Sequence, residues 1–238
     1  EKFGVTAEVG YNVDSFGHNG NLPKILSNSG MSKYIFMRPM PHEKNLPQSL
    51  FNWESSDGSS VVTYRIPFFY NIDQTRFEMF ERVKDMDEDY DMMAFFGVGN
   101  HGGGPTIELL DRMNRELDEN YIYSTPNEYF DAVAGEALPT VKDDLQFHAK
   151  GCYSACSDIK AGNRKSENAV LNTEKFSVLS EKLINTPYPV DELDRAWKNI
   201  MFNQFHDILG GCSIREAYTD AGYLHGEAMS ISERCTNF

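Results

Sequence analysis

Two kinds of periodicity divide this chain and limit what it can fold into. Over roughly the first 140 residues, short apolar runs of β-type composition alternate with amphipathic helical patterns, whereas from about residue 145 onward the pattern is mostly helical. Strands alternating with helices are typical of an α/β domain, layered or barrel-like, and consecutive long helices favour a bundle. The sequence therefore predicts an α/β domain over residues 1–143 and a helical domain over residues 144–238.

Individual elements follow from the same patterns. The strands expected are residues 11–13, 34–37, 61–66, 92–96 and 121–123, and the helices expected are residues 23–26, 78–87, one opened by Pro105 and Thr106, 169–184, 190–202 and one starting at Ser213. The run 92–96 is too short for a helix and is bounded by glycines, which favours a buried strand. It is followed by a loop, a helix and residues 121–123, so a βαβ unit is predicted. Ser213 and Glu216 have the spacing of a capping box.

The net charge and the cysteine content limit which binding partners and which cellular compartment are expected. With 22 basic and 36 acidic residues the formal net charge is -14, which argues against nucleic acid or an anionic membrane surface as partner. No apolar run approaches the roughly 20 residues needed to span a bilayer. The four cysteines have neither zinc-ribbon spacing nor the density of a disulfide scaffold. A neutral or cationic ligand and a cytoplasmic location are therefore expected.

An aspartate follows the first expected strand. Asp14 lies just past residues 11–13 and is followed by Phe16 and Gly17. Catalytic groups of α/β barrels lie at this end of the strands. An aspartate at such a position equally often caps a turn. Position alone leaves both interpretations open.

Near the other end of the chain, His206 and Asp207 stand side by side between apolar residues and a glycine pair. Imidazole and carboxylate groups are good zinc ligands. A histidine in an apolar helix is more often a hydrogen-bonded core residue, and an aspartate there can bond to the glycine turn. The pair by itself does not identify a metal site.

A glycine-rich loop, residues 97–106, precedes a helix, and such loops can hold phosphate with their backbone amides. This loop has no P-loop lysine. Its spacing also departs from the dinucleotide fingerprint, and no acidic residue follows the next expected strand. A substrate-facing loop at a barrel mouth is favoured over a nucleotide site.

Five segments, in this order and at these separations, resemble the retaining α-mannosidases of glycoside hydrolase family 38. They are residues 13–18, 51–58, 97–106, 151–154 together with 163–164, and 203–208. The resemblance covers nearly the whole chain. It implies that residues 1–143 are the back part of a seven-stranded (β/α) barrel-like catalytic domain and that residues 144–238 begin a three-helix bundle domain.

The resemblance also implies roles for single residues. Asp14 matches the nucleophile, which also touches a zinc ion, and His206 matches another ligand of that ion. Sugar-binding positions of the family are matched by Phe16, Arg38, Tyr70 and Asp207. The activity implied is hydrolysis of terminal α-linked mannose through a covalent mannosyl-enzyme intermediate, with one zinc ion gripping the sugar hydroxyls.

The general acid/base departs from the family pattern. Many members carry an aspartate in the loop where this sequence has Asn100 followed by His101. An asparagine cannot usefully donate a proton, whereas a histidine titrates near neutrality, so His101 is the candidate. One alternative is a catalytically inactive carbohydrate-binding relative, motivated by Asn100. Another is a metal-dependent deacetylase, against which the lack of a further histidine cluster counts.

The family's remaining zinc ligands, an early His-x-Asp pair, have no match in this sequence. They are expected upstream, so the chain is expected to be a fragment that neither binds zinc tightly nor turns over substrate alone. The expected partner is a mannose-containing oligosaccharide, with no nucleic acid and no membrane, and the parent protein could form a homo-oligomer. Linkage preference depends on regions beyond the glycone pocket.

Overall fold

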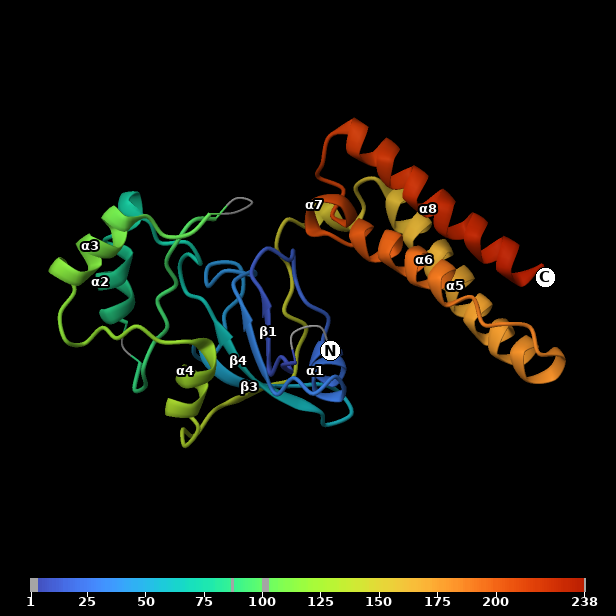
Figure 1. The fold of residues 1–238 in the computed structure, drawn as a ribbon. Coiled ribbons are helices and arrows are strands. Elements are labelled where there is room, and N and C mark those ends of the chain that lie inside the picture. The colour runs from blue at the N-terminus through green and yellow to red at the C-terminus, as the bar shows by residue number, and fades with distance from the viewer. Residues whose placement is uncertain (1–3, 87, 100–102, 238) are drawn as a thin grey trace. The chain divides into compact units, whose positions relative to one another are not determined.

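The chain folds into two compact units, Glu1–His148 and Ala149–Phe238. The structure is a computed structural model and describes residues 4–86, 88–99 and 103–237. All strands of the described residues belong to the first unit, and the second unit is helical (Figure 1). The α/β class predicted for the first part of the chain is confirmed.

A five-stranded mixed sheet forms the centre of the first unit. Its elements are β1 (Val9–Asn12), α1 (Leu22–Asn28), β2 (Lys33–Phe36), β3 (Leu50–Glu54), β4 (Ser60–Arg65), η1 (Gln74–Arg76), α2 (Met79–Lys84), α3 (Ile107–Glu116), α4 (Pro126–Ala132) and β5 (Thr140–Val141). The strand order is β1-β2-β4-β3-β5. The strands β1, β2 and β4 run parallel, and β3 is antiparallel to β4 and parallel to β5. The described strands leave β1 and β5 as edges, so a seven-stranded barrel-like domain stays a prediction.

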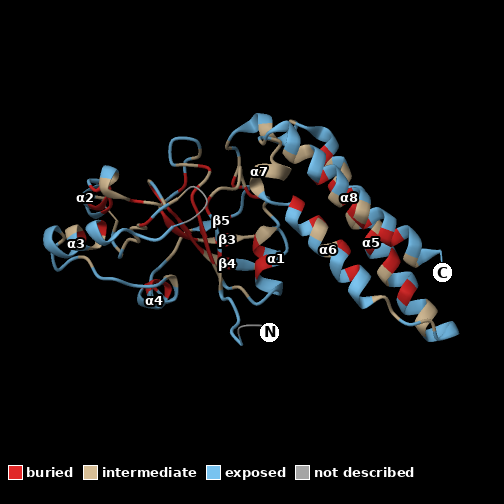
Figure 2. Cartoon of the chain, turned by 45° about the horizontal axis from the view of Figure 1, so that its top comes forward, coloured by how far each residue is buried: buried red, intermediate tan, exposed pale blue. Residues whose placement is uncertain are grey.

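Successive side chains of β2 point to opposite faces of the sheet, and both faces are buried there. Tyr34 and Phe36 point into one apolar cluster, which includes Leu26 of α1. Ile35, between them in sequence, joins the cluster on the opposite face with Phe130 of α4. Because successive side chains of a strand point to opposite faces, one run of aromatic and branched residues is covered by a helix on each side. Figure 2 shows the strands as mostly buried.

A third apolar cluster of this unit lies among η1, α2 and α3. Phe77 and Phe80 pack there with Leu109 and Met113 of α3. The helix α3 begins as predicted, because the hydroxyl of Thr106 caps it by accepting from the amide of Leu109 at 3.2 Å. The apolar spacing on α3 thus buries its face against α2 and η1.

Two predicted strands do not form. Within residues 92–96, one isolated bridge joins Phe96 to Ile72, and the amide and carbonyl of Met93 bond instead to the hydroxyl of Tyr64, at 3.0 and 3.1 Å. Residues 121–123 form a connection in which Ile122 is 82% and Tyr123 58% exposed. The predicted βαβ unit is therefore wrong. Apolar composition alone does not supply the neighbouring backbone that a strand needs.

The second unit consists of helices around one apolar core. Its elements are η2 (Lys150–Tyr153), α5 (Ser157–Ile184), α6 (Val190–Asn203), α7 (His206–Leu209) and α8 (Arg215–Thr236). The core is shared by α5, α6 and α8 and contains Val170, Leu193, Ala196, Ile200, Ala228 and Ile231. Buried residues form stripes along these three helices in Figure 2, as expected for amphipathic helices.

The start of α8 differs from the prediction. The N-cap residue is Ile214, which makes no side-chain capping bond, so the capping box predicted for Ser213 and Glu216 is wrong. The amide of Ser213 donates instead to the hydroxyl of Tyr218 at 2.8 Å. A tyrosine from within the helix thus holds the backbone of the residue that precedes the N-cap.

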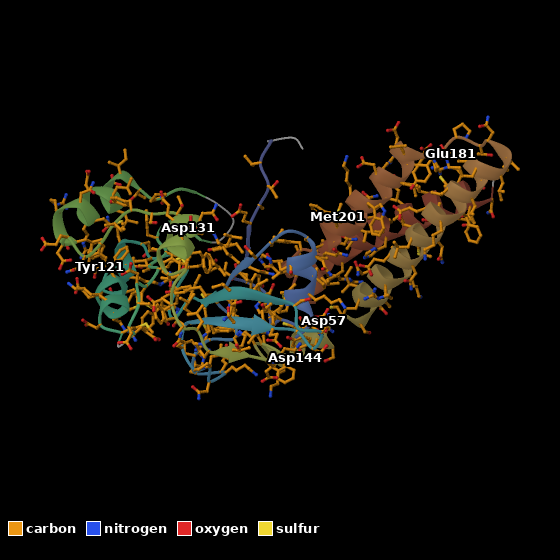
Figure 3. All side chains as sticks on the ribbon, turned by 90° about the horizontal axis from the view of Figure 1, so that it is seen from below. Asp57, Tyr121, Asp131, Asp144, Glu181 and Met201 are labelled. Atoms are coloured by element: carbon orange, nitrogen blue, oxygen red, sulfur yellow. The ribbon has the colours of Figure 1, made fainter. Side chains whose placement is uncertain are left out.

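Acidic side chains lie at the surface of the first unit, where Figure 3 labels Asp57, Asp131 and Asp144. Lys24 pairs with Asp57 at 3.1 Å and Lys33 pairs with Asp131 at 3.1 Å. Exposed pairs of this kind contribute little to stability. No helix of the described residues combines the length and apolarity needed to cross a bilayer.

Candidate active site

The ends of two neighbouring parallel strands place Asp14 opposite Arg38. In the register of β1 and β2, Asn12 lies beside Phe36, and Asp14 and Arg38 each follow two residues later. Parallel strands bring their carboxyl ends to the same edge of a sheet, where the sites of α/β proteins lie. The sequence thus carries both side chains to one edge.

Three predicted site residues are in contact at this edge. A guanidinium nitrogen of Arg38, Nη1, lies 2.9 Å from Asp14 Oδ1. The hydroxyl of Tyr70, which comes five residues after β4, donates to Asp14 Oδ2 at 3.2 Å. The side chains of Asp14 and Arg38 are 24% and 27% exposed. The carboxylate is oriented from two sides and remains partly accessible to solvent.

Tyr11 also belongs to this site, although the sequence indicated it only as part of a strand. Burial, the hydroxyl of Tyr70 and the charge of Asp14 together raise the pKa of Tyr11 to about 12. Its ring lies 5.9 Å from that of Phe95. A tyrosine three residues before the candidate nucleophile gave no separate signal, because aromatic residues are common in strands.

The glycine-rich loop reaches Tyr70. A Cβ atom added to Gly99 would lie 2.5 Å from Asn71 Nδ2 and 3.1 Å from the hydroxyl oxygen of Tyr70. A side chain at this position would have to displace the ends of the Asn71 and Tyr70 side chains. The described part of the loop therefore borders the candidate site. The proton-donor candidate His101 lies outside the described residues.

The side chain of His18 contacts the backbone of Arg38 in the candidate site. Its ring is buried, with Nε2 2.9 Å from the carbonyl oxygen of Arg38 and Nδ1 3.0 Å from the hydroxyl of Tyr34. Burial lowers the pKa of His18 to about 4, against the opposing effect of the bond to Arg38. A neutral imidazole that donates from Nε2 and accepts at Nδ1 satisfies both partners. His18 is thus a hydrogen-bonded core histidine that holds the backbone of Arg38.

Phe16, predicted to contact sugar, lies two residues beyond Asp14 in the same loop. Its ring is stacked on that of His148, with centroids 6.0 Å apart and an interplanar angle of 20°. The sequence gave no indication of His148, which is distant in the chain. The first unit therefore brings together Asp14, Arg38 and Tyr70, with Phe16 nearby.

The other two predicted site residues, His206 and Asp207, open α7 in the second unit. The turn that follows is fixed, since Gly211 has a φ of +80° and a Cβ there would lie 2.6 Å from the carbonyl oxygen of Ala155. The thiol of Cys212 lies 3.7 Å from the carbonyl oxygen of His206. The local structure thus holds the His206 segment in a defined turn.

The residues that precede His206 are hydrogen-bonded to α5. The side-chain amide of Gln204 donates to Glu167 at 2.8 Å and to the buried Asn163 at 3.3 Å. The adjacent Asn203, also buried, donates to the carbonyl of Ala221 in α8 at 3.0 Å. Side-chain amides therefore fix the corner between α6 and α7 to both neighbouring helices.

The donor types on this chain suit zinc, but their number does not complete a site. A carboxylate from Asp14 and an imidazole from His206 are ligands that zinc prefers, and a zinc site needs about four. Among residues 4–86, 88–99 and 103–237, no group of three or more His, Cys, Asp or Glu side chains is arranged to hold a metal ion. Any zinc bound through Asp14 or His206 requires further ligands.

Comparison with known proteins gives matches along the whole chain. The family model described as "Glycosyl hydrolases family 38 N-terminal domain" matches residues 1–150, and that of the "Alpha mannosidase middle domain" matches residues 146–237. Similar curated proteins are alpha-mannosidase G of Dictyostelium discoideum, 29% identical over 96% of this chain, and the alpha-mannosidase of Saccharomyces cerevisiae, 28% identical over 91%. The chain spans 22% of the length of each.

Among solved structures, an alpha-mannosidase from Enterococcus faecalis V583 superposes with a TM-score of 0.82 at 21% identity, over 99% of this chain and 30% of that one. A family 38 protein from Enterococcus faecalis superposes with a TM-score of 0.70 at 20% identity, over 99% of this chain and 27% of that one. These structures share the fold of the chain. Because the family model covers residues 1–150, the chain belongs to glycosyl hydrolase family 38.

Proposed function

We propose that the protein to which this chain belongs is a retaining α-mannosidase that removes terminal α-linked mannose from oligosaccharides. The observation that carries the proposal is the carboxylate of Asp14, held by Arg38 at 2.9 Å and Tyr70 at 3.2 Å, at the carboxyl ends of parallel strands. Membership of family 38 and the α-mannosidase relatives support it.

Asp14 is the nucleophile of this proposal. One of its oxygens forms a bond to the anomeric carbon while the bond to the leaving oxygen breaks, and a general acid protonates that oxygen. The deprotonated form of that acid then takes a proton from water as the water oxygen attacks the same carbon and releases Asp14, so the anomeric configuration is retained. Arg38 and Tyr70 keep the carboxylate in one orientation, which lowers the entropic cost of reaching the reactive geometry. Phe16 and Asp207 are the proposed contacts to the sugar.

Asp14 and His206 are the residues of this chain that would hold zinc, with the remaining ligands supplied from outside it. When bound, the ion would supply a Lewis acid that grips neighbouring sugar hydroxyls and favours a distorted ring. This chain alone is proposed to be inactive, because it carries only part of that ligand set.

His101 is the proposed proton donor to the leaving oxygen. A general acid matters most when the leaving group is poor. The variant His101→Gln should therefore lose activity on an alkyl mannoside and keep most of it on a dinitrophenyl mannoside. Equal activity of the variant and the unmodified enzyme on the alkyl substrate would remove His101 from this role.

The direct test is hydrolysis of an aryl α-mannoside by the full-length protein, before and after chelation and re-addition of zinc, beside the variant Asp14→Asn. The proposal expects activity that chelation removes, that zinc restores and that Asp14→Asn lacks. Activity that survives both treatments would contradict it.

A binding-only protein is the alternative, favoured by Asn100 where many family members have a carboxylate. Calorimetry with mannose on the same preparation separates the two. Tight sugar binding without turnover of any mannoside would replace the enzymatic proposal with this one.

A further inference from the structure

The loop that carries Asp14 and Phe16 is paired with a segment more than a hundred residues away, residues 144–148. The amide of His18 donates to the carbonyl of Leu145 at 2.7 Å, and the amide of Leu145 donates back at 2.9 Å. The amide of His148 donates to the carbonyl of Phe16 at 3.3 Å. Segment 144–148 therefore lies antiparallel along the loop that follows β1.

The side chains of the segment add to this pairing. The carboxylate of Asp144, labelled in Figure 3, accepts from the amide of Gly20 at the far end of the loop. At the near end, the imidazole of His148 stacks on Phe16, with ring centroids 6.0 Å apart and an interplanar angle of 20°. That geometry lies within the range of favourable offset stacking. The loop is thus held at both ends by side chains of one segment.

The imidazole of His148 is held in turn by the carboxylate of Glu43. Its Nδ1 lies 2.7 Å from Glu43 Oε1, and Glu43 Oε2 accepts from the amide of Met40 at 2.7 Å. Burial tends to raise the pKa of Glu43, but the bonds from Met40 and His148 and the nearby charges of His148 and His42 outweigh it and lower the pKa. An ionised Glu43 requires a proton on Nδ1 of His148, which fixes the ring orientation.

The contacts of His148 with Glu43 and with Phe16 form one continuous series. Glu43 belongs to the turn that follows Arg38, His148 lies between Glu43 and Phe16, and Phe16 follows Asp14. Besides the contact of Asp14 with Arg38 and the bond of His18 to the carbonyl of Arg38, the loops after β1 and β2 therefore share a second connection between side chains, through Phe16, His148 and Glu43. The side chains of His148 and Glu43 are 25% and 20% exposed, so the second connection is partly shielded from water.

We propose that His148, held by Glu43, is a positioning residue that sets the plane of the Phe16 ring against the sugar. The inference rests on the proposed function, because it assigns Phe16 to the sugar-binding pocket. An aromatic wall binds well only if its ring is ordered before the sugar arrives, since ordering it on binding costs affinity. His148 therefore acts on substrate binding and only weakly on the chemical step.

The test is steady-state hydrolysis of an aryl α-mannoside by the full-length protein carrying variants of His148. His148→Ala and His148→Gln should raise KM about three- to tenfold, the range of one stacking contact, with kcat changed less than about twofold. His148→Phe keeps a ring and should have a KM close to that of the unmodified enzyme. Tyr223→Ala, which truncates an exposed ring of α8 in the second unit, is the control and should change neither constant.

Hydrogen exchange on the same variants gives a readout that needs no activity. In His148→Ala the amides of residues 16–18 should exchange faster than in His148→Phe. An unchanged KM in the active His148→Ala enzyme, or equal KM values for His148→Gln and His148→Phe, would overturn the inference. If the unmodified protein hydrolyses no mannoside, the proposed function is wrong, and equal exchange in His148→Ala and His148→Phe would then overturn the positioning role as well.

Discussion

Arg38 Nη1 lies 2.9 Å from Asp14 Oδ1, and both residues stand two positions beyond the ends of adjacent parallel strands. The pairing of β1 and β2 in one register makes this contact, so the sheet itself aligns the candidate nucleophile with its cation. With Tyr70 on the other oxygen, the carboxylate has little rotational freedom.

Replacement of Arg38 by Met removes the cation and leaves a similar volume. Loss of a hydrogen bond between charged groups costs about 1.5–3 kcal/mol, so kcat/KM of the full-length enzyme should fall roughly 10- to 100-fold. Lys24→Met is the control, because Lys24 pairs with Asp57 at the surface, 3.1 Å apart and 51% exposed. Its kcat/KM should not change. Equal kcat/KM in Arg38→Met and the unmodified enzyme would exclude a role for this ion pair.

Replacement of Tyr70 by Phe removes one donor to Asp14 and leaves the ring in place. We expect kcat/KM to fall about three- to tenfold, and the midpoint of thermal unfolding to stay the same within error. Tyr123→Phe removes an exposed hydroxyl that bonds to Asn114 and serves as the comparison. If both variants behave alike, the contact between Tyr70 and Asp14 has no part in catalysis.

Gly99 and Gly104 provide a matched pair in the glycine-rich loop. A Cβ at Gly99 would lie 2.5 Å from Asn71 Nδ2, whereas a Cβ at Gly104 would have no neighbour within 4 Å. Gly99→Ala should displace the ends of the Asn71 and Tyr70 side chains and thereby reduce kcat/KM. Gly104→Ala should leave kcat/KM unchanged. The opposite order of the two variants would contradict the close approach of Gly99 to Tyr70.

The buried His18 makes stability depend on pH. Its pKa falls from an ordinary 6.5 to about 4 in the folded state, so between these values the unfolded chain binds a proton that the folded chain does not. Stability should therefore decline as pH drops from about 6.5 to 4, by up to about 3 kcal/mol from this residue. His18→Gln keeps a hydrogen-bonding side chain without this titration. Urea unfolding across that window should show a shallower decline for the variant, and identical pH slopes would refute the assignment.

Much of the site could be inferred from the sequence because its residues follow strand ends. Asp14 lies in a segment that resembles a family motif, Arg38 matches a family position one strand later, and the parallel register of their strands explains why they meet. The sequence did not indicate Tyr11 or His148 as site residues, for different reasons. Tyr11 looks like any strand aromatic, and His148 reaches Phe16 only through the pairing of segment 144–148 with the loop after β1. Contacts between distant segments leave no periodic signal.

The two predicted strands that do not form fail for the same physical reason. Residues 92–96 and 121–123 have the composition of strands, yet the backbone of Met93 bonds to the side chain of Tyr64, and Ile122 is exposed. Strand formation depends on the neighbouring strand that supplies hydrogen bonds, and that neighbour is not encoded locally. The start of α3 agrees with the prediction because its cap, Thr106, is a local signal, and α6 agrees because 3.6-residue periodicity is local as well.

The central claim is that Asp14 attacks the anomeric carbon, and trapping of the covalent intermediate tests it most directly. The full-length enzyme would be incubated with an activated fluorosugar of manno configuration, which slows hydrolysis of a glycosyl-enzyme, then digested with protease and sequenced by mass spectrometry. We predict that the added sugar mass maps to Asp14. A label on any other residue of an active enzyme would contradict the account.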